Sequence, residues 1–126
     1  GVSISTLASV FQSEEDFHDV NQVKVVIGDD GNALYFSRAP IPFSRDEDIR
    51  WTLKGNRYAY KHIGLYAYRK EFLNGFLSST EGDLEKLEKL EQLRALQQGF
   101  KIAVEIVDGI SIGVDVPEDL VKINFT

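Results

Sequence analysis

The sequence predicts an α/β fold in which a mixed β-sheet containing a β-hairpin is flanked by helices. Three observations support this prediction. Segments rich in β-formers alternate with helical segments, two of the β-rich segments are joined by a short turn, and the 126 residues are 43% hydrophobic and 27% charged. That composition is typical of a globular domain with one core, and the alternation favours packed layers of strands and helices.

The first half of the chain should contain a short helix, a hairpin and a long loop. Apolar residues between positions 3 and 18 recur closer to helical spacing than to alternation, so we predict a helix that ends near Asp19. Segments 23–27 and 33–37 are β-rich, and the intervening GDDGN tolerates the positive φ of a hairpin turn. Residues 39–57 hold two of the three prolines and are predicted to form a loop.

The second half alternates between the two kinds of element. A helix at 83–98 is the strongest signal, and Gly99 directly after it is suited to end it. The other expected elements are a strand at 60–69, a short helix at 71–77, a strand at 101–107, a further strand at 110–114 and a closing helical turn at 117–123.

Composition excludes several classes of function. The chain has no cysteine, which removes disulfides, thiolate metal sites and cysteine nucleophiles, and fits a reducing cytoplasm. The net charge of −6 argues against nonspecific binding to nucleic acid or to an anionic membrane. No apolar run approaches the roughly 20 residues of a membrane-spanning helix. We therefore expect a cytoplasmic protein that acts on small molecules.

Positive charge is concentrated in one segment of this acidic chain. Eight basic and three acidic residues lie between Arg38 and Lys70, which is where an anionic ligand is expected to bind. Arg38 and Arg45 bracket the proline-marked loop, and a guanidinium can contact a carboxylate or phosphate with two hydrogen bonds. An exposed arginine beside the acidic residues 46–48 could equally form a surface ion pair.

Four further polar residues could contact a ligand or serve the fold alone. Glu91 follows Leu84 by seven residues, which places its carboxylate on the apolar face of the predicted helix, either paired with Arg94 or facing a ligand beside Gln92. His62 and Tyr66 are four residues apart and share a strand face, where they could line a sugar site or form part of the core.

Asp115 also has two interpretations. Asp115-Val116-Pro117-Glu118 matches a capping box with proline in the first helical turn, and that role alone explains the aspartate. An aspartate between a strand and a helix of an α/β fold can also bind a hard cation. The spacing leaves both roles open.

Five segments together resemble the C-terminal half of CMP-KDO synthetases, the cytidylyltransferases that activate 3-deoxy-manno-octulosonate. These segments are N-x-V-K-V-V at 21–26, ALYFSRAPIPFSRD at 33–46, YKHIGLYAYR at 60–69, LEKLEKLEQLRALQQG at 84–99 and GVDVPEDL at 113–120. The segments at 33–46 and 60–69 are the ones specific to this family. Val116 departs from the family pattern, which usually has threonine there.

The resemblance implies a partial nucleotide-diphospho-sugar transferase-like, Rossmann-like fold, and an enzyme that transfers CMP from CTP to KDO for lipopolysaccharide biosynthesis. It assigns Mg²⁺ to Asp115, which would be the catalytic residue. It also implies a homodimer. The residues it places around the sugar acid are Arg38, Arg45, His62, Tyr66, Glu91 and Gln92.

The resemblance further implies that residues 1–126 form the sugar-acid-binding and dimerisation portion, without the N-terminal nucleotide-binding half. On that interpretation the chain alone does not turn over CTP. Two alternatives stay open: a non-catalytic module that binds a sugar acid or mediates dimerisation, and a cytidylyltransferase for an amino-substituted octulosonate.

Overall fold

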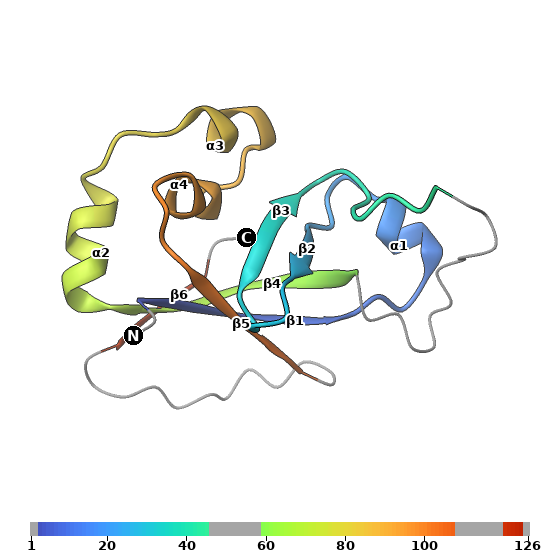
Figure 1. Ribbon diagram of the computed structural model, residues 1–126, viewed down its shortest axis with the longest axis horizontal. Coiled ribbons are helices and arrows are strands. Elements are labelled where there is room, and N and C mark those ends of the chain that lie inside the picture. The colour runs from blue at the N-terminus through green and yellow to red at the C-terminus, as the bar shows by residue number, and fades with distance from the viewer. Residues whose placement is uncertain (1–2, 46–58, 108–119, 125–126) are drawn as a thin grey trace.

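A mixed β-sheet organises the molecule, and the helices α2, α3 and α4 lie together on one side of it (Figure 1). The computed structural model describes residues 3–45, 59–107 and 120–124, the last segment by its backbone. The elements in chain order are β1 (Ile4–Val10), α1 (Glu14–His18), β2 (Lys24–Ile27), β3 (Ala33–Ser37), β4 (Tyr60–Arg69), α2 (Lys70–Leu77), α3 (Asp83–Glu88), α4 (Gln92–Gln97), β5 (Ile102–Ile106) and β6 (Leu120–Asn124).

The sheet order in the described part of the chain is β3-β2-β4-β1-β5, with β6 also paired to β4. The β1–β5 pair is parallel and the other pairs are antiparallel. Strand β4 is therefore central, with β1 on one side and β2 and β6 on the other. This arrangement confirms the predicted α/β class and its mixed sheet.

The hairpin was predicted correctly, including its turn. Gly31 adopts a φ of 82°, and the Gly28 amide donates to the Asn32 carbonyl at 2.8 Å. The Gly31 carbonyl in turn accepts from the Val104 amide at 3.0 Å, which ties the hairpin tip to β5. The hairpin is thus held at both ends, and the core cluster, which includes Phe36, Tyr66, Tyr68, Leu93 and Ile102, fills the space between sheet and helices.

The predicted helix over 3–18 is wrong for most of its length. Residues 4–10 form β1, in which Ile4, Thr6 and Ala8 are buried in alternation. A strand between two partners suits this pattern, since β-branched residues pack well on a pleated surface. A helix occurs only at α1, where the Ser13 hydroxyl caps the Asp16 amide and the last residue precedes Asp19, as expected.

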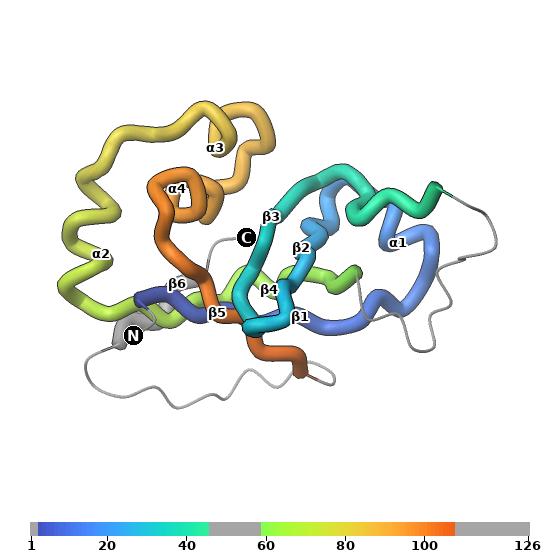
Figure 2. Tube along the Cα trace, in the orientation of Figure 1, coloured from blue at the N-terminus to red at the C-terminus, as the bar shows by residue number. Residues whose placement is uncertain are grey.

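The predicted helix over 83–98 is divided into α3 and α4. Lys89 adopts the left-handed conformation with φ 58°, and α4 begins at Gln92. Leucines recurring every three residues drift around a straight helix, so one axis cannot direct all of them at the same core. The break lets Leu90 and Leu93 both reach the buried cluster, and Gly99, with φ 92°, ends the second helix as predicted. Figure 2 shows this segment arching from α2 through α3 and α4 back to β5.

The closing helical turn predicted at 117–123 is wrong where the structure describes it, because residues 120–124 pair with β4 as strand β6. Val121 and Ile123 are β-branched residues two positions apart, which favours a strand wherever a free sheet edge is available. The strand predicted at 110–114, residues 46–57 of the predicted loop and residues 117–119 lie outside the described residues. Residues 39–45 carry neither helix nor strand, in agreement with the loop prediction.

Candidate functional site

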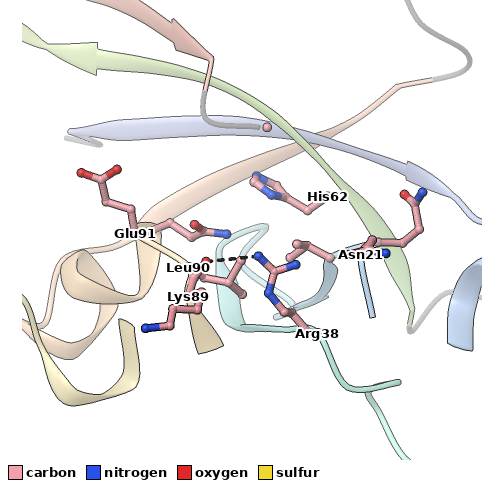
Figure 3. Close-up of a pocket in the computed structure, with 10 residues that line it drawn as sticks. Asn21, Arg38, His62, Lys89, Leu90 and Glu91 are labelled. Carbon is pink, nitrogen blue, oxygen red and sulfur yellow. Dashed lines mark hydrogen bonds between the residues drawn. The ribbon is translucent and has the colours of Figure 1, made fainter. Parts of the chain in front are cut away.

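A cleft of about 590 Å³ opens between the start of β4, the end of β3 and the break between α3 and α4. Figure 3 shows Arg38, His62 and Glu91 around it, from three separate parts of the chain. The lining residues are Asn21, Gln22, Val23, Arg38, His62, Gly64, Lys89, Leu90, Glu91 and Gln92. Four of the six residues predicted to hold a sugar acid therefore share this cleft: Arg38, His62, Glu91 and Gln92.

The break between α3 and α4 supplies one wall of the cleft. The left-handed Lys89 turns the chain, so that residues 89–92 face the cleft. Glu91 keeps 32% of its side chain exposed and lies 3.8 Å from the nearest Arg94 nitrogen, while Arg94 bonds Glu85 at 2.8 Å. Glu91 therefore has both features considered from the sequence: a loose ion pair with Arg94, and a position in the cleft.

Arg38 is fixed in place by the main chain. Its Nε donates to the Glu88 carbonyl at 2.8 Å, Nη1 donates to the Val20 carbonyl at 3.1 Å, and Nη2 donates to the Lys89 carbonyl at 3.2 Å. A guanidinium has five N–H groups, so the contacts with described residues leave two that a ligand could use. The carbonyls exposed by the helix break thus orient the arginine, and Figure 3 shows its guanidinium beside Lys89 and Leu90.

Two charged side chains behind the cleft hold Arg38 and its neighbours. The buried Lys24 donates all three ammonium protons to main-chain carbonyls, of Asp19 at 2.6 Å, Gln22 at 2.6 Å and Arg38 at 2.7 Å. Burial is the main reason that the pKa of Lys24 is lowered. Glu88 Oε1 accepts from the Arg38 amide at 2.9 Å. The cleft wall is therefore preorganised by groups that do not face it.

His62 and Tyr66 lie on the same face of β4, as predicted, with ring centroids 5.3 Å apart. The register of β1 and β4 shifts between Thr6 and Leu7, a β-bulge that skips two residues of β4 and so preserves the alternation of faces. Only His62 lines the cleft, whereas Tyr66 is buried beneath it. The buried Tyr66 ring thus packs against the His62 ring.

The His62 ring is neutral at physiological pH. Burial lowers its pKa to about 3, because the surroundings penalise the charged form. The ring packs edge-on against Phe36, with centroids 4.8 Å apart. His62 can therefore exchange hydrogen bonds with a ligand, but it adds no positive charge to the cleft.

Mild acid should destabilise the fold through this ring. Its pKa is about 3 in the folded protein and about 6.5 when unfolded, so the unfolded state binds more protons between these values. The contribution of the neutral ring to the free energy of unfolding is complete above pH 6.5 and is lost as the pH falls toward 3. We expect a loss of about 1 kcal/mol of unfolding free energy between about pH 6.5 and 5.5, measured by urea denaturation. His62→Gln should lack this pH-dependent loss of unfolding free energy. Equal losses in wild type and His62→Gln would contradict the prediction.

Besides Tyr66, two further predicted residues are not placed in the cleft. Arg45 is exposed and is not among the lining residues, and Asp115 lies outside the described residues. In the described segments no three His, Asp or Glu side chains converge as metal ligands. The assignments of Arg45 to the sugar acid and of Asp115 to Mg²⁺ therefore stay predictions.

Asn21, Gln22 and Lys89 line the cleft but were not identified as candidates from the sequence. Asn21 is the first residue of the N-x-V-K-V-V segment, and its place in that motif is the signal that marks it as a candidate. Lys89 gave no signal, because in an unbroken helix it would be one of many exposed lysines. It is a second basic residue, besides Arg38, in the lining of the cleft.

Comparison with known proteins decides the family. The family model for cytidylyltransferases matches residues 2–104. The chain belongs to the cytidylyltransferase family. The match runs from β1 into the first part of β5 and includes every residue that lines the cleft.

Individual cytidylyltransferases give the same result. The 3-deoxy-manno-octulosonate cytidylyltransferase of Thermodesulfovibrio yellowstonii is 49% identical over 94% of this chain and 46% of its own length. The protein of the same name from Bacteroides thetaiotaomicron is 50% identical over 93% of this chain and 48% of its own. The chain thus spans about half the length of the curated relatives it matches.

A solved cytidylyltransferase structure confirms the fold. The CMP:2-keto-3-deoxy-manno-octonic acid synthetase complexed with CTP superposes with a TM-score of 0.76 and 34% sequence identity. The superposition covers 93% of this chain and 45% of that one. The resemblance drawn from the motifs is confirmed. Separately, no helix in the part of the chain that the structure describes has the length and hydrophobicity needed to span a membrane.

Proposed function

We propose that this chain forms the sugar-acid-binding part of a 3-deoxy-manno-octulosonate cytidylyltransferase. The enzyme transfers CMP from CTP to KDO and releases pyrophosphate, as a cytoplasmic step toward lipopolysaccharide. The observation that carries the proposal is the single cleft shared by Arg38, His62, Glu91 and Gln92. The names of the relatives at 45–50% identity support the choice of substrate.

The chemistry of the cleft suits a hydroxylated acid. Arg38 and Lys89 provide positive charge for a carboxylate, and Glu91 provides a charged acceptor for hydroxyls. Gln92 and Asn21 can both donate and accept hydrogen bonds. A volume of about 590 Å³ lies within the usual range for a small-molecule site.

The rest of the reaction is assigned to groups other than those that line the cleft. The match spans about half of each relative, so we propose that CTP is bound with residues beyond those of the cleft. We propose Arg45 as a further contact to the sugar acid, Asp115 as a Mg²⁺ ligand and a homodimer as the assembly. When bound, Mg²⁺ would neutralise charge on the phosphates of CTP. The chain's own residues hold the acid so that its hydroxyl faces the nucleotide.

The test is a substrate-dependent pyrophosphate assay on the protein at the full length its gene encodes. We expect pyrophosphate release with CTP that requires KDO and gives CMP-KDO. Faster turnover of an amino-substituted octulosonate would reassign the substrate within the same chemistry. Binding of KDO without turnover would support a non-catalytic module. The absence of both KDO binding and turnover would refute the proposal.

A further inference from the structure

The Thr6 hydroxyl occupies a position that constrains the proton on His62. Thr6 lies on β1, 2% exposed, at the bulge where β4 passes beside it. Its Oγ1 is 2.8 Å from the Leu65 carbonyl, 3.2 Å from the Ile63 carbonyl and 2.9 Å from His62 Nε2. One hydroxyl thus meets three possible hydrogen-bond partners.

Counting protons assigns each of these contacts. A hydroxyl has a single hydrogen to donate, and a carbonyl oxygen can only accept. The hydrogen of Thr6 therefore points to a carbonyl, Leu65 being the nearer, and the hydroxyl oxygen accepts from His62 Nε2. In the opposite assignment Thr6 donates to His62, and two carbonyl oxygens face the lone pairs of the hydroxyl at 2.8 and 3.2 Å without a hydrogen between them.

This assignment fixes the tautomer of the ring. A neutral imidazole has one N–H, and the low pKa of about 3 keeps His62 neutral at pH 7. With the proton on Nε2, Nδ1 is a bare acceptor. Among the described residues Nδ1 has no hydrogen-bond partner, while the ring lines the cleft (Figure 3).

We propose that Thr6 is a positioning residue that fixes His62 as the Nε2–H tautomer, so that His62 offers only an acceptor to a ligand. The group that meets His62 is then a hydroxyl, and a carboxylate is repelled by the Nδ1 lone pair. This orients the sugar acid with its carboxylate on the side of Arg38 and Lys89. The tautomer follows from the contacts of Thr6 with a neutral ring, whereas the identity of the ligand rests on the proposed function.

The tautomer is measured directly by ¹⁵N NMR of histidine-labelled protein at pH 7, at the full length its gene encodes. A His62→Gln spectrum assigns the ring nitrogens by subtraction. We expect Nε2 to carry the proton and Nδ1 to be unprotonated in the protein without ligand. A proton on Nδ1, or on both nitrogens, would overturn the proposal, whatever the enzyme's activity.

Two variants test the role of the hydroxyl. Thr6→Val removes it at nearly constant volume, and Thr6→Ser retains it. In Thr6→Val we expect the tautomer preference to weaken and the Kd for KDO to rise by about fivefold, the equivalent of one hydrogen bond, with the Kd for CTP unchanged. Thr6→Ser should keep the wild-type tautomer and Kd. If Thr6→Val keeps both, or if Thr6→Ser loses both, Thr6 does not act through the tautomer.

Discussion

Replacing Arg94 with methionine should lower the free energy of unfolding by about 3 kcal/mol, the lower end of the range for breaking a buried ion pair. Arg94 donates from Nε and Nη2 to the two oxygens of Glu85, each at 2.8 Å, and from Nη1 to the carbonyls of Phe76 and Ser79. Methionine leaves the Glu85 carboxylate and both carbonyls without this cation. We take the lower end because α2, α3 and α4 form an outer layer of the molecule (Figure 1).

The effect should be specific to this pair. The hydrogen bond from Arg94 is the main reason that the pKa of Glu85 is lowered, which shows that the carboxylate is stabilised as an anion. Lys86→Met, which removes an exposed cation on α3, the helix of Glu85, should change stability by less than about 0.5 kcal/mol. Converting Glu85 to leucine in the Arg94→Met background should recover part of the loss. A loss below about 1 kcal/mol for Arg94→Met in urea denaturation would contradict this account.

The Glu85–Arg94 pair also explains why the divided helix keeps one geometry. Arg94 lies on α4, Glu85 lies on α3 and Phe76 lies on α2, with the guanidinium carbon 4.9 Å from the centre of the Phe76 ring. The three helices are thereby joined by residues that do not line the cleft. Loss of this link should allow the Lys89 turn to shift, and with it Glu91 and Gln92.

Local signals in the sequence were sufficient for much of the fold. The hairpin, the strand at 60–69 and the stop at Gly99 each depend on residues close together in the chain, namely turn formers, β-branched runs and a glycine with positive φ. Those predictions are confirmed. The four predicted residues that share the cleft also lie in motifs recognisable from local sequence, and their role in binding a sugar acid stays a prediction.

Features set by distant partners could not be predicted in the same way. The break at Lys89 is stabilised by Arg38, about fifty residues earlier, whose guanidinium donates hydrogen bonds to the carbonyls of Glu88 and Lys89. Strand β1 becomes a strand because β4 and β5 flank it, and β6 forms on an edge of β4. The roles of Lys24 and Thr6 likewise appear only when the carbonyls around them are placed.

Glu91 connects the fold to the proposed chemistry and gives the second large effect. Glu91 lines the cleft, and its ion pair with Arg94 is long at 3.8 Å, while Arg94 bonds Glu85 at 2.8 Å. Glu91→Ala should therefore leave stability nearly unchanged and remove a charged acceptor for the sugar hydroxyls. A hydrogen bond to a charged group contributes about 1.5–3 kcal/mol, so binding of KDO should weaken roughly 10- to 100-fold. Glu91→Gln, which keeps a neutral acceptor, should fall between alanine and wild type.

The most direct measurement is a calorimetric titration of KDO into the protein at the full length its gene encodes, comparing wild type, Glu91→Ala and Glu105→Ala. Glu105 is an exposed carboxylate on β5, away from the residues that line the cleft. We expect the Kd for KDO to be raised roughly 10- to 100-fold for Glu91→Ala alone, with the Kd for CTP the same in all three proteins. Equal KDO affinities for wild type and Glu91→Ala would show that the sugar acid binds elsewhere.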